Sequence, residues 1–331
     1  MIKKILATLL MSISAAAALA VPFGSQSVLV VEDGGKVLLE KNANQIVPIA
    51  SLTKLMTAMV VLDAKQDMNE LIAIEQRDVD MLKHSTSRVP VGSHISRADV
   101  LQLALMSSDN RAAASLARTF AGGAVGFKAA VRAKIAALGM TNTIIEEPTG
   151  LSPNNRSTAQ DLVKMATAAS SYPEIARITT ESSDLINING RSVEYHNTNR
   201  LVGAKGWDIG LSKTGYTEEA GKCLIMRITS AGKNATLVLL NAKASSARIM
   251  DALNIRRFIS GEEAPMMASR SAPRQRQRLV ISNNPQIMKA SVRTGARQRI
   301  VISNNTPIMK TGLKTRVKAS KAKLQQRRRR A

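Results

Sequence analysis

The pattern of apolar and polar positions predicts one folded domain over residues 21–260 of this 331-residue chain. Alternating apolar residues around Asp33-Gly34-Gly35 predict a β-hairpin near its start. Apolar residues three and four apart predict helices in the middle, and alternation returns beyond residue 207. The predicted strands are 27–31, 36–39, 208–214, 222–229 and 235–242; the predicted helices begin at Ser51, follow the N-cap Ser96, resume after Asn110, and cover 125–138, 161–171 and 251–259.

This order of elements predicts the fold class. Two strands come first, a run of helices follows, and three strands and a final helix close the domain. Strands grouped in this way favour an antiparallel sheet with helices packed on it, so the pattern predicts an α+β domain rather than a doubly wound parallel sheet.

The first twenty residues are expected to be a cleaved signal peptide. Lys3 and Lys4 precede an apolar run over residues 5–19, and Ala18-Leu19-Ala20 has the small residues of a cleavage site. A membrane anchor is the alternative, but the run is short for a bilayer span and Pro22 and Gly24 interrupt it. The mature protein is therefore expected outside the cytoplasm.

Residues 261–331 differ from the rest in composition. They carry 18 Lys or Arg against Glu262 and Glu263, a net charge of +16 out of +23 for the chain, and contain no aromatic residue. The stretch 276–289 recurs at 297–310, a period of 21 residues. The segment is predicted to be a disordered basic tail. It either binds anionic lipid, lipopolysaccharide or wall material or is simply solvated, whereas export and the missing aromatics disfavour nucleic acid.

Cysteine and histidine usage excludes several kinds of chemistry. Cys223 is the only cysteine, so an internal disulfide is impossible, and its place in a predicted strand favours a small core residue over a reactive thiol. The 3 histidines have no zinc-ligand spacing. We expect neither a metal nor a cofactor, and a His-dependent triad is disfavoured.

Ser51 and Lys54 are the first candidate catalytic residues. Residues three apart share one helix face, so the serine hydroxyl and the lysine amine should lie side by side. The surrounding positions are apolar, and a desolvated lysine loses affinity for its proton and can serve as the base that a serine nucleophile needs. Taken alone, the pattern favours a helix N-cap serine and a solvated lysine, since Ser-x-x-Lys recurs at 230–233 and 320–323.

Two further motifs favour the catalytic interpretation of Ser51 and Lys54. Ser108-Asp109-Asn110 falls in the gap between two predicted helices, and Lys213-Thr214-Gly215 ends a predicted strand. Copies of both patterns in the tail, at 282–284, 303–305 and 310–312, lack these settings. The three motifs in this order are typical of penicillin-binding proteins and class A β-lactamases.

Over about residues 25–260 the chain resembles the low-molecular-mass penicillin-binding proteins of the D-alanyl-D-alanine carboxypeptidase group, and most of all the D-alanyl-D-alanine endopeptidases of Gram-negative bacteria. The resemblance rests on the three motifs and on the stretches 87–92, 137–140, 147–155, 195–199 and 211–221. It implies a serine β-lactamase/DD-peptidase-like fold with a five-stranded antiparallel sheet. It also implies a periplasmic enzyme that acts on peptidoglycan peptide stems and is acylated by β-lactams.

The resemblance implies a role for each matching residue. Ser51 is the expected nucleophile, Lys54 its base, and Ser108 a proton relay to the leaving amine. Asn110 is expected to hold the substrate backbone. Lys213, Thr214 and Gly215 are expected to contact the carboxylate end of the substrate, and the backbone N–H groups of Ser51 and Tyr216 to form the oxyanion hole.

Three functional alternatives stay open at this point. The motifs are common to endopeptidases, which open D-Ala–diaminopimelate cross-links, and to carboxypeptidases, which release terminal D-alanine; the resemblance outside the motifs favours the endopeptidases. A β-lactamase is disfavoured because Leu151 stands where a water-holding asparagine is expected after Glu147. A non-catalytic protein that binds the wall or another anionic surface through its tail is disfavoured because every motif residue is intact.

Overall fold

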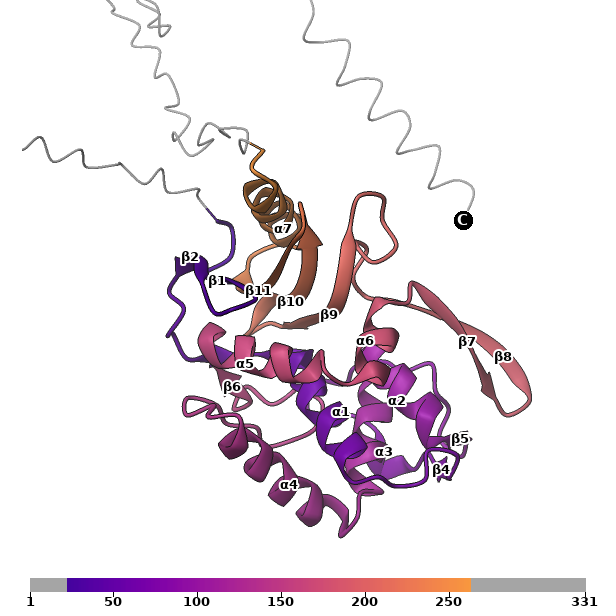
Figure 1. Ribbon diagram of the computed structural model, residues 1–331. Coiled ribbons are helices and arrows are strands. Elements are labelled where there is room, and N and C mark those ends of the chain that lie inside the picture. The colour runs from indigo at the N-terminus through magenta and orange to yellow at the C-terminus, as the bar shows by residue number, and fades with distance from the viewer. Residues whose placement is uncertain (1–22, 263–331) are drawn as a thin grey trace, which may run out of the picture. The chain divides into compact units, whose positions relative to one another are not determined.

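A computed structural model describes residues 23–262 of the chain (Figure 1). The predicted signal peptide and all but the first two residues of the predicted tail lie outside this range. The strands are β1 (Ser27–Glu32), β2 (Val37–Lys41), β3 (Val47–Pro48), β4 (Leu71–Ala73), β5 (His94–Ser96), β6 (Arg156–Ser157), β7 (Ser183–Ile188), β8 (Arg191–His196), β9 (Asp208–Thr217), β10 (Gly221–Ser230) and β11 (Lys233–Ala242). The helices are α1 (Thr53–Asp63), α2 (Arg97–Met106), α3 (Asn110–Arg118), α4 (Gly123–Ala137), α5 (Ala159–Ala169), α6 (Pro173–Thr180) and α7 (Ser245–Ser260), with short 3-10 turns at Ala50–Leu52 (η1) and Gln76–Asp78 (η2).

The main sheet has five strands in the order β2-β1-β11-β10-β9, and every neighbouring pair is antiparallel. Helix α7 packs on one face, and α5 with the other helices packs on the opposite face (Figure 1). The predicted α+β class and five-stranded antiparallel sheet are therefore confirmed. Within residues 23–262, β9 forms one edge of this sheet and pairs with β10.

Successive side chains of a strand point to opposite faces of the sheet, so the sheet has a separate apolar core on each face. Val28 and Val30 point into the cluster under α7, whereas Leu29 between them points into the larger cluster on the helical side. Along β10, Leu224 likewise faces α7 and Ile225 the helical side. The sheet is thus covered by apolar packing on both faces, which fixes the position of its edge strand β9.

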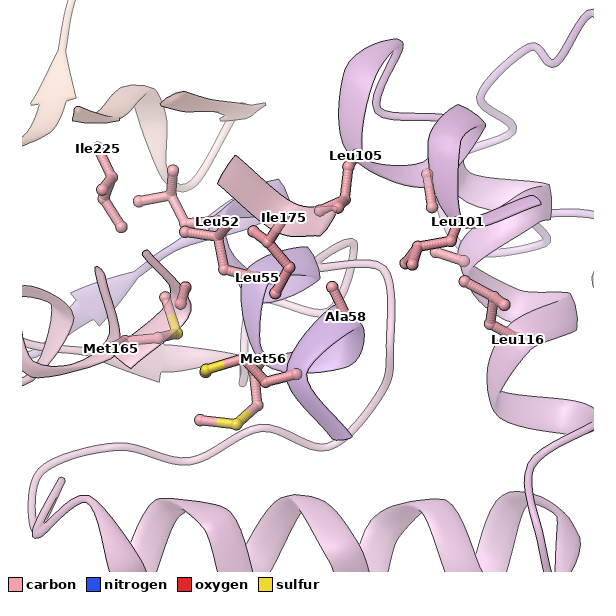
Figure 2. Packing of buried hydrophobic residues seen from close by; sticks show 14 of the residues in the cluster. Leu52, Leu55, Met56, Ala58, Leu101, Leu105, Leu116, Met165, Ile175 and Ile225 are labelled. Carbon is pink, nitrogen blue, oxygen red and sulfur yellow. The ribbon is translucent and has the colours of Figure 1, made fainter. Parts of the chain in front are cut away.

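Helix α1 lies in the middle of the larger core. Its residues 53–61 are all buried, and Leu55, Met56 and Ala58 are surrounded by apolar side chains from the sheet and from several helices (Figure 2). A helix that is apolar on every side is stable only when other elements enclose it completely. The same enclosure removes water from any polar side chain that α1 carries.

Several boundaries differ from the predictions. The predicted strand 208–214 continues to Thr217, and the last helix begins at Ser245 rather than Asp251. Helix α6 and the β7–β8 hairpin were not anticipated, and neither were the two-stranded pairs β3–β6 and β4–β5. The strands β3, β4, β5 and β6 are two or three residues long, too short for a period to be recognised, and β3 pairs with a strand about a hundred residues away.

Candidate active site

The structure brings Ser51 and Lys54 into contact, as their spacing predicts. Ser51 lies within the 3-10 turn that leads into α1, and its hydroxyl does not cap the helix. Lys54 Nζ donates to Ser51 Oγ at 2.9 Å. The lysine side chain is 1% exposed. The hydroxyl, which is partly exposed, thus contacts a buried amine, and a solvated lysine at this position is excluded.

Lys54 has two more hydrogen-bond acceptors, and both are oxygens that can only accept. Its Nζ donates to Asn110 Oδ1 and to the Thr149 carbonyl, each at 2.7 Å. A neutral amine keeps two N–H donors and one lone pair. If both donors stay on the two carbonyl oxygens, the lone pair faces Ser51 Oγ. The geometry thus points the basic site of the amine at the serine hydroxyl.

Burial lowers the pKa of Lys54 from 10.5 to about 8, although the carboxylates of Glu147, Asp109 and Asp80 oppose this change. Burial also lowers the pKa of Lys213 well below its ordinary value, and the positive charges of Lys54 and Arg248 add to the effect. The direction agrees with the desolvation expected from the apolar sequence around Lys54. With a pKa of about 8, about one-tenth of this amine is unprotonated at pH 7.

The second motif lies across from the first. Asp109 is the N-cap of α3, with its side chain accepting from the Ala112 N–H, so the capping role in this gap falls to the middle residue of the motif. Ser108 has a backbone φ of +60°, which is uncommon for a residue other than glycine. Its hydroxyl accepts from Lys213 Nζ at 2.9 Å. The structure therefore joins the second and third motifs directly.

The orientation of the Asn110 amide is set by a chain of hydrogen bonds. Asp80 Oδ2 accepts from Ser85 Oγ at 2.6 Å, so this hydroxyl has already used its proton and accepts from Asn110 Nδ2 at 2.8 Å. The amide oxygen must then face Lys54. Sequence reasoning missed Asp80 and Ser85, because they lie in a loop 25 or more residues away and have no local pattern.

Two glycines bring the chain close to the nucleophile. A Cβ atom on Gly215 would lie 3.1 Å from both Ser51 N and Ile49 O, so β9 passes directly beside the start of α1. A Cβ on Gly150 would lie 1.9 Å from Ala50 O, and Gly150 also has a φ of +86°. Gly215, predicted to contact substrate, is here a contact residue for the Ser51 turn. Gly150 was not predicted as a site residue.

The remaining predicted residues line the same region. Thr214 is buried, and its hydroxyl shares a hydrogen bond of 2.6 Å with that of Thr198. Tyr216 is 54% exposed, with Lys222 Nζ 3.0 Å from the centre of its ring. Cys223 is fully buried in β10, as a core residue should be. Among the described residues, no cluster of three His, Cys, Asp or Glu side chains is placed to hold a metal.

The Glu147 carboxylate is surrounded by hydrogen-bond donors of its own turn and of Asn155. It accepts from the backbone N–H groups of Thr149 and Gly150, from the Thr149 hydroxyl and from Asn155 Nδ2. These bonds shape the turn whose Thr149 carbonyl faces Lys54. Leu151, where a β-lactamase of class A would have a water-holding asparagine, is a buried apolar residue here. Leu151 therefore offers no polar side chain that could position a hydrolytic water, and the Glu147 carboxylate is engaged by donors of the protein itself.

Comparison with known proteins agrees with this site. The family model for D-alanyl-D-alanine carboxypeptidases (peptidase S11) matches residues 14–244. A D-alanyl-D-alanine endopeptidase of Pseudomonas aeruginosa is 45% identical, covering 77% of this chain and 84% of the relative. One of Escherichia coli is 40% identical, covering 77% and 90%. Carboxypeptidases among the relatives are less similar, as in the 29% identity of Bacillus subtilis DacF.

Solved structures share the fold. The Streptomyces K15 DD-transpeptidase superposes with a TM-score of 0.66 at 24% identity, over 72% of this chain and 97% of that one. Penicillin-binding protein D2 of Listeria monocytogenes, in an ampicillin-bound form, gives 0.61 at 27% identity, over 70% and 95%. Since the family model spans more than half of the chain and close relatives match over most of their length, the chain belongs to the D-alanyl-D-alanine carboxypeptidase family of peptidases, S11.

Proposed function

We propose that the chain is a serine endopeptidase that opens D-alanyl–diaminopimelate cross-links in peptidoglycan through an acyl-enzyme on Ser51. One observation carries the serine mechanism: the buried Lys54 amine contacts two carbonyl oxygens and the Ser51 hydroxyl. The choice of endopeptidase over carboxypeptidase rests on the relatives of highest identity, which bear that name.

Acylation begins with proton transfer from Ser51 Oγ to the lone pair of Lys54. The oxygen attacks the D-alanyl carbonyl carbon, and the carbonyl π electrons move onto its oxygen. The backbone N–H groups of Ser51 and Tyr216 donate hydrogen bonds to this oxyanion, since the Gly215 contact brings β9 beside Ser51. The result is a tetrahedral intermediate bound to Ser51 and a protonated Lys54.

Collapse of the intermediate expels the amine of the second stem. Ser108 Oγ, which is hydrogen-bonded to Lys213 Nζ, gives its proton to the leaving nitrogen, and the proton that Lys54 took from Ser51 replaces it, so Lys54 is again neutral. The amine departs with the electrons of the C–N bond, and the acyl ester remains on Ser51. Water then attacks the ester and gives a proton to Lys54, and the second tetrahedral intermediate collapses by breaking its bond to Ser51 Oγ. The serine oxygen takes that proton back from Lys54, and the stem is released as a free acid.

Substrate binding is assigned to the free edge of β9 and to Asn110. An extended peptide can pair with an edge strand through its backbone. Asn110 keeps one amide hydrogen after its bond to Ser85 and can donate it to a substrate carbonyl. Lys213 and Thr214 provide the positive and hydroxyl groups for the carboxylate adjacent to the leaving nitrogen.

The test compares two substrates with the full chain. A cross-linked muropeptide dimer and an uncross-linked pentapeptide are incubated separately, with Ser51→Ala as control, and products are identified by mass spectrometry. We expect monomers from the dimer and none with Ser51→Ala. Release of D-alanine from the pentapeptide alone would make the protein a carboxypeptidase. Equal activity of Ser51→Ala would refute the acyl-enzyme.

A periplasmic location and acylation of Ser51 by β-lactams belong to the same proposal. The location is supported by the signal-peptide pattern of residues 1–20. None of the helices in residues 23–262 combines the length and apolar character that a bilayer-crossing segment needs. Labelling by a fluorescent penicillin, absent in Ser51→Ala, tests the second point, and cell fractionation tests the first.

The tail at 261–331 is proposed to attach the enzyme to anionic lipid or lipopolysaccharide. Its net charge of +16 is the only support. Co-sedimentation with anionic vesicles, weakening with salt and lost on truncation after residue 262, is the expected result. Equal binding by the truncated chain would contradict it.

A further inference from the structure

An ion pair joins the two sides of the candidate active site. Lys83 belongs to the loop of residues 80–88, which follows η2, and Glu219 belongs to the turn between β9 and β10. Lys83 Nζ contacts Glu219 Oε1, and this contact lowers the pKa of Glu219. The two side chains come from segments 136 residues apart and remain 35% and 38% exposed.

The loop that carries Lys83 is firmly attached to the rest of the site. The Asp80 carboxylate accepts from the backbone N–H groups of Leu82, Lys83 and Ser85. Ser87 Oγ donates to Asp109 Oδ2 at 2.7 Å, beside the Ser108 motif. Lys83 is therefore presented at a fixed place relative to Asn110 and Ser51.

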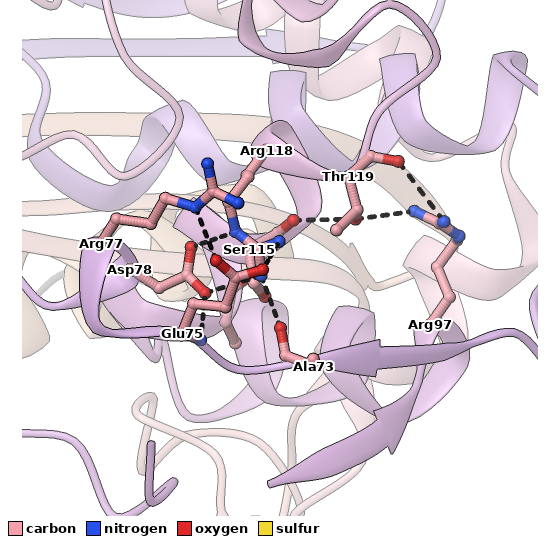
Figure 3. A network of polar contacts seen from close by, with 9 residues as sticks. Ala73, Glu75, Arg77, Asp78, Arg97, Ser115, Arg118 and Thr119 are labelled. Atoms are coloured by element: carbon pink, nitrogen blue, oxygen red, sulfur yellow. Dashed lines mark hydrogen bonds and ion pairs between the residues drawn. The ribbon is translucent and has the colours of Figure 1, made fainter. Parts of the chain in front are cut away.

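The element before this loop is also anchored. Arg118 of α3 binds Asp78 and Glu75 of the η2 turn and the Ala73 carbonyl of β4 (Figure 3). Asp78 is 3% exposed, so this is a mostly buried network. The segment before the loop 80–88 is thus held in place by side chains of the helical side. Among the ion pairs of residues 23–262, Lys83–Glu219 is the one that connects this loop to the main sheet.

The position of the pair along β9 indicates which part of a substrate it meets. In the proposed binding mode the carboxylate beside the leaving amine lies at Lys213 and Thr214, and the reacting carbonyl lies at the Tyr216 N–H. The acyl-donor stem must then continue toward Glu219. Tyr216 and Glu219 are three residues apart, at most about 10 Å of chain, and the residue preceding the D-alanine has its Cα about 3.8 Å from that of the D-alanine.

That preceding residue, in a D-alanyl–diaminopimelate cross-link, is the donor stem's own diaminopimelate. Its side chain ends in a carbon with an ammonium and a carboxylate. A pair of opposite charges suits such a zwitterion, because Lys83 exchanges the Glu219 carboxylate for the ligand's carboxylate, and Glu219 exchanges the Lys83 ammonium for the ligand's ammonium. Both groups are accessible to water, and an exposed ion pair is weak enough to be opened by a ligand.

We propose that Lys83 and Glu219 form a subsite for the zwitterionic end of the diaminopimelate side chain in the acyl-donor stem, with Lys83 binding its carboxylate and Glu219 its ammonium. This inference rests on the proposed endopeptidase function and adds the groups that select the donor stem. Binding involves no covalent change. The subsite selects stems that carry diaminopimelate over stems that carry lysine, which lacks the terminal carboxylate.

The experiment measures kcat/KM of the full chain on two cross-linked dimers that differ only in the donor residue, diaminopimelate or lysine. The variants are Lys83→Met, Glu219→Gln, the charge swap K83E/E219K, and Arg77→Met. Arg77 is a matched control, because it forms an exposed ion pair with Glu75 and contacts no residue of the candidate active site. Thermal unfolding of each variant verifies that it is folded.

Wild type and Arg77→Met should prefer the diaminopimelate dimer by about tenfold, the size expected for one charge-assisted contact. In Lys83→Met the ratio of the two kcat/KM values should fall to about one. Glu219→Gln should lower kcat/KM on both dimers, since both carry the ammonium. The charge swap restores the ion pair but reverses the two charges, so it should not restore the preference.

Four results would overturn the inference. An equal loss of kcat/KM on both dimers in Lys83→Met would mean that the ion pair only holds the loop 80–88 against the sheet. Recovery of the diaminopimelate preference in the charge swap would mean the same. No preference in wild type would refute the subsite while leaving the endopeptidase intact. If wild type opens neither dimer, the proposed function itself is wrong and the subsite is refuted together with it.

Discussion

The rate of Ser51 acylation should rise with pH up to about 8 and then level off. Lys54 must be unprotonated before it can accept the proton of Ser51. Burial lowers the pKa of Lys54 to about 8, against the opposing charges of Glu147, Asp109 and Asp80. The variable to change is therefore pH. The pH at which the acylation rate stops rising should equal the pKa of Lys54.

The expected magnitude follows from the two pKa values. At pH 7 a lysine with a pKa of about 8 is about one-tenth unprotonated, whereas one at 10.5 is unprotonated in about 3 molecules in 10,000. Burial thus increases the amount of free base about 300-fold at pH 7. Below pH 7 the rate should change about tenfold for each pH unit.

The same shift has a cost in stability. The folded state binds the Lys54 proton less tightly than the unfolded chain does, so between pH 8 and 10.5 the unfolded state carries more protons. The contribution of Lys54 to the free energy of unfolding should therefore rise with pH in that window. Below pH 8 the buried charge costs the fold about 3 kcal/mol.

The assay is the second-order rate constant of acylation by a fluorescent penicillin, measured by stopped flow from pH 6 to 10. Ser51→Ala gives the background, and Lys128→Met, which removes an exposed lysine of α4, is the matched control. Wild type and the control should share a limb near 8. A limb near 10.5 would show that Lys54 is not desolvated in solution, and a flat profile would show that it is not the base.

Three further predictions concern the surroundings of Lys54 and the core. Asp109→Asn keeps an N-cap residue but removes a charge that raises the pKa of Lys54, so the limb should move to lower pH; a shift to higher pH in the same assay would contradict this. Gly150→Ala must accommodate a clash with Ala50 O and a positive φ, so it should lose about 3 kcal/mol, or about 10 °C in melting temperature by calorimetry; a wild-type melting temperature would refute the close contact. Burial raises the pKa of Cys223 to about 11, so an aromatic disulfide reagent should modify this thiol only after unfolding in guanidinium; rapid reaction of the native protein would show that β10 opens.

The sequence alone was sufficient to predict contacts and elements whose residues are close together in the chain. The Ser51–Lys54 contact follows from helix periodicity, and the strands β1, β2, β9, β10 and β11 follow from alternation and turn residues. The desolvation of Lys54 was also predictable, because apolar residues on every side of a helix require that it be enclosed.

Only the tertiary structure decided the contacts that give these residues their chemistry. The other two acceptors of Lys54 lie 56 and 95 residues away, and Lys213 and Ser108 are 105 residues apart. Asp80 and Ser85 have no periodicity or motif that marks them, since loops are positioned by what they contact. The sequence by itself determined which elements form and which side chains carry the chemistry, because both depend on short-range periodicity and residue type. The packing of β9 and the loop 80–88 around α1 determined where those side chains meet, because hydrogen bonds between distant segments exist only once the core has closed.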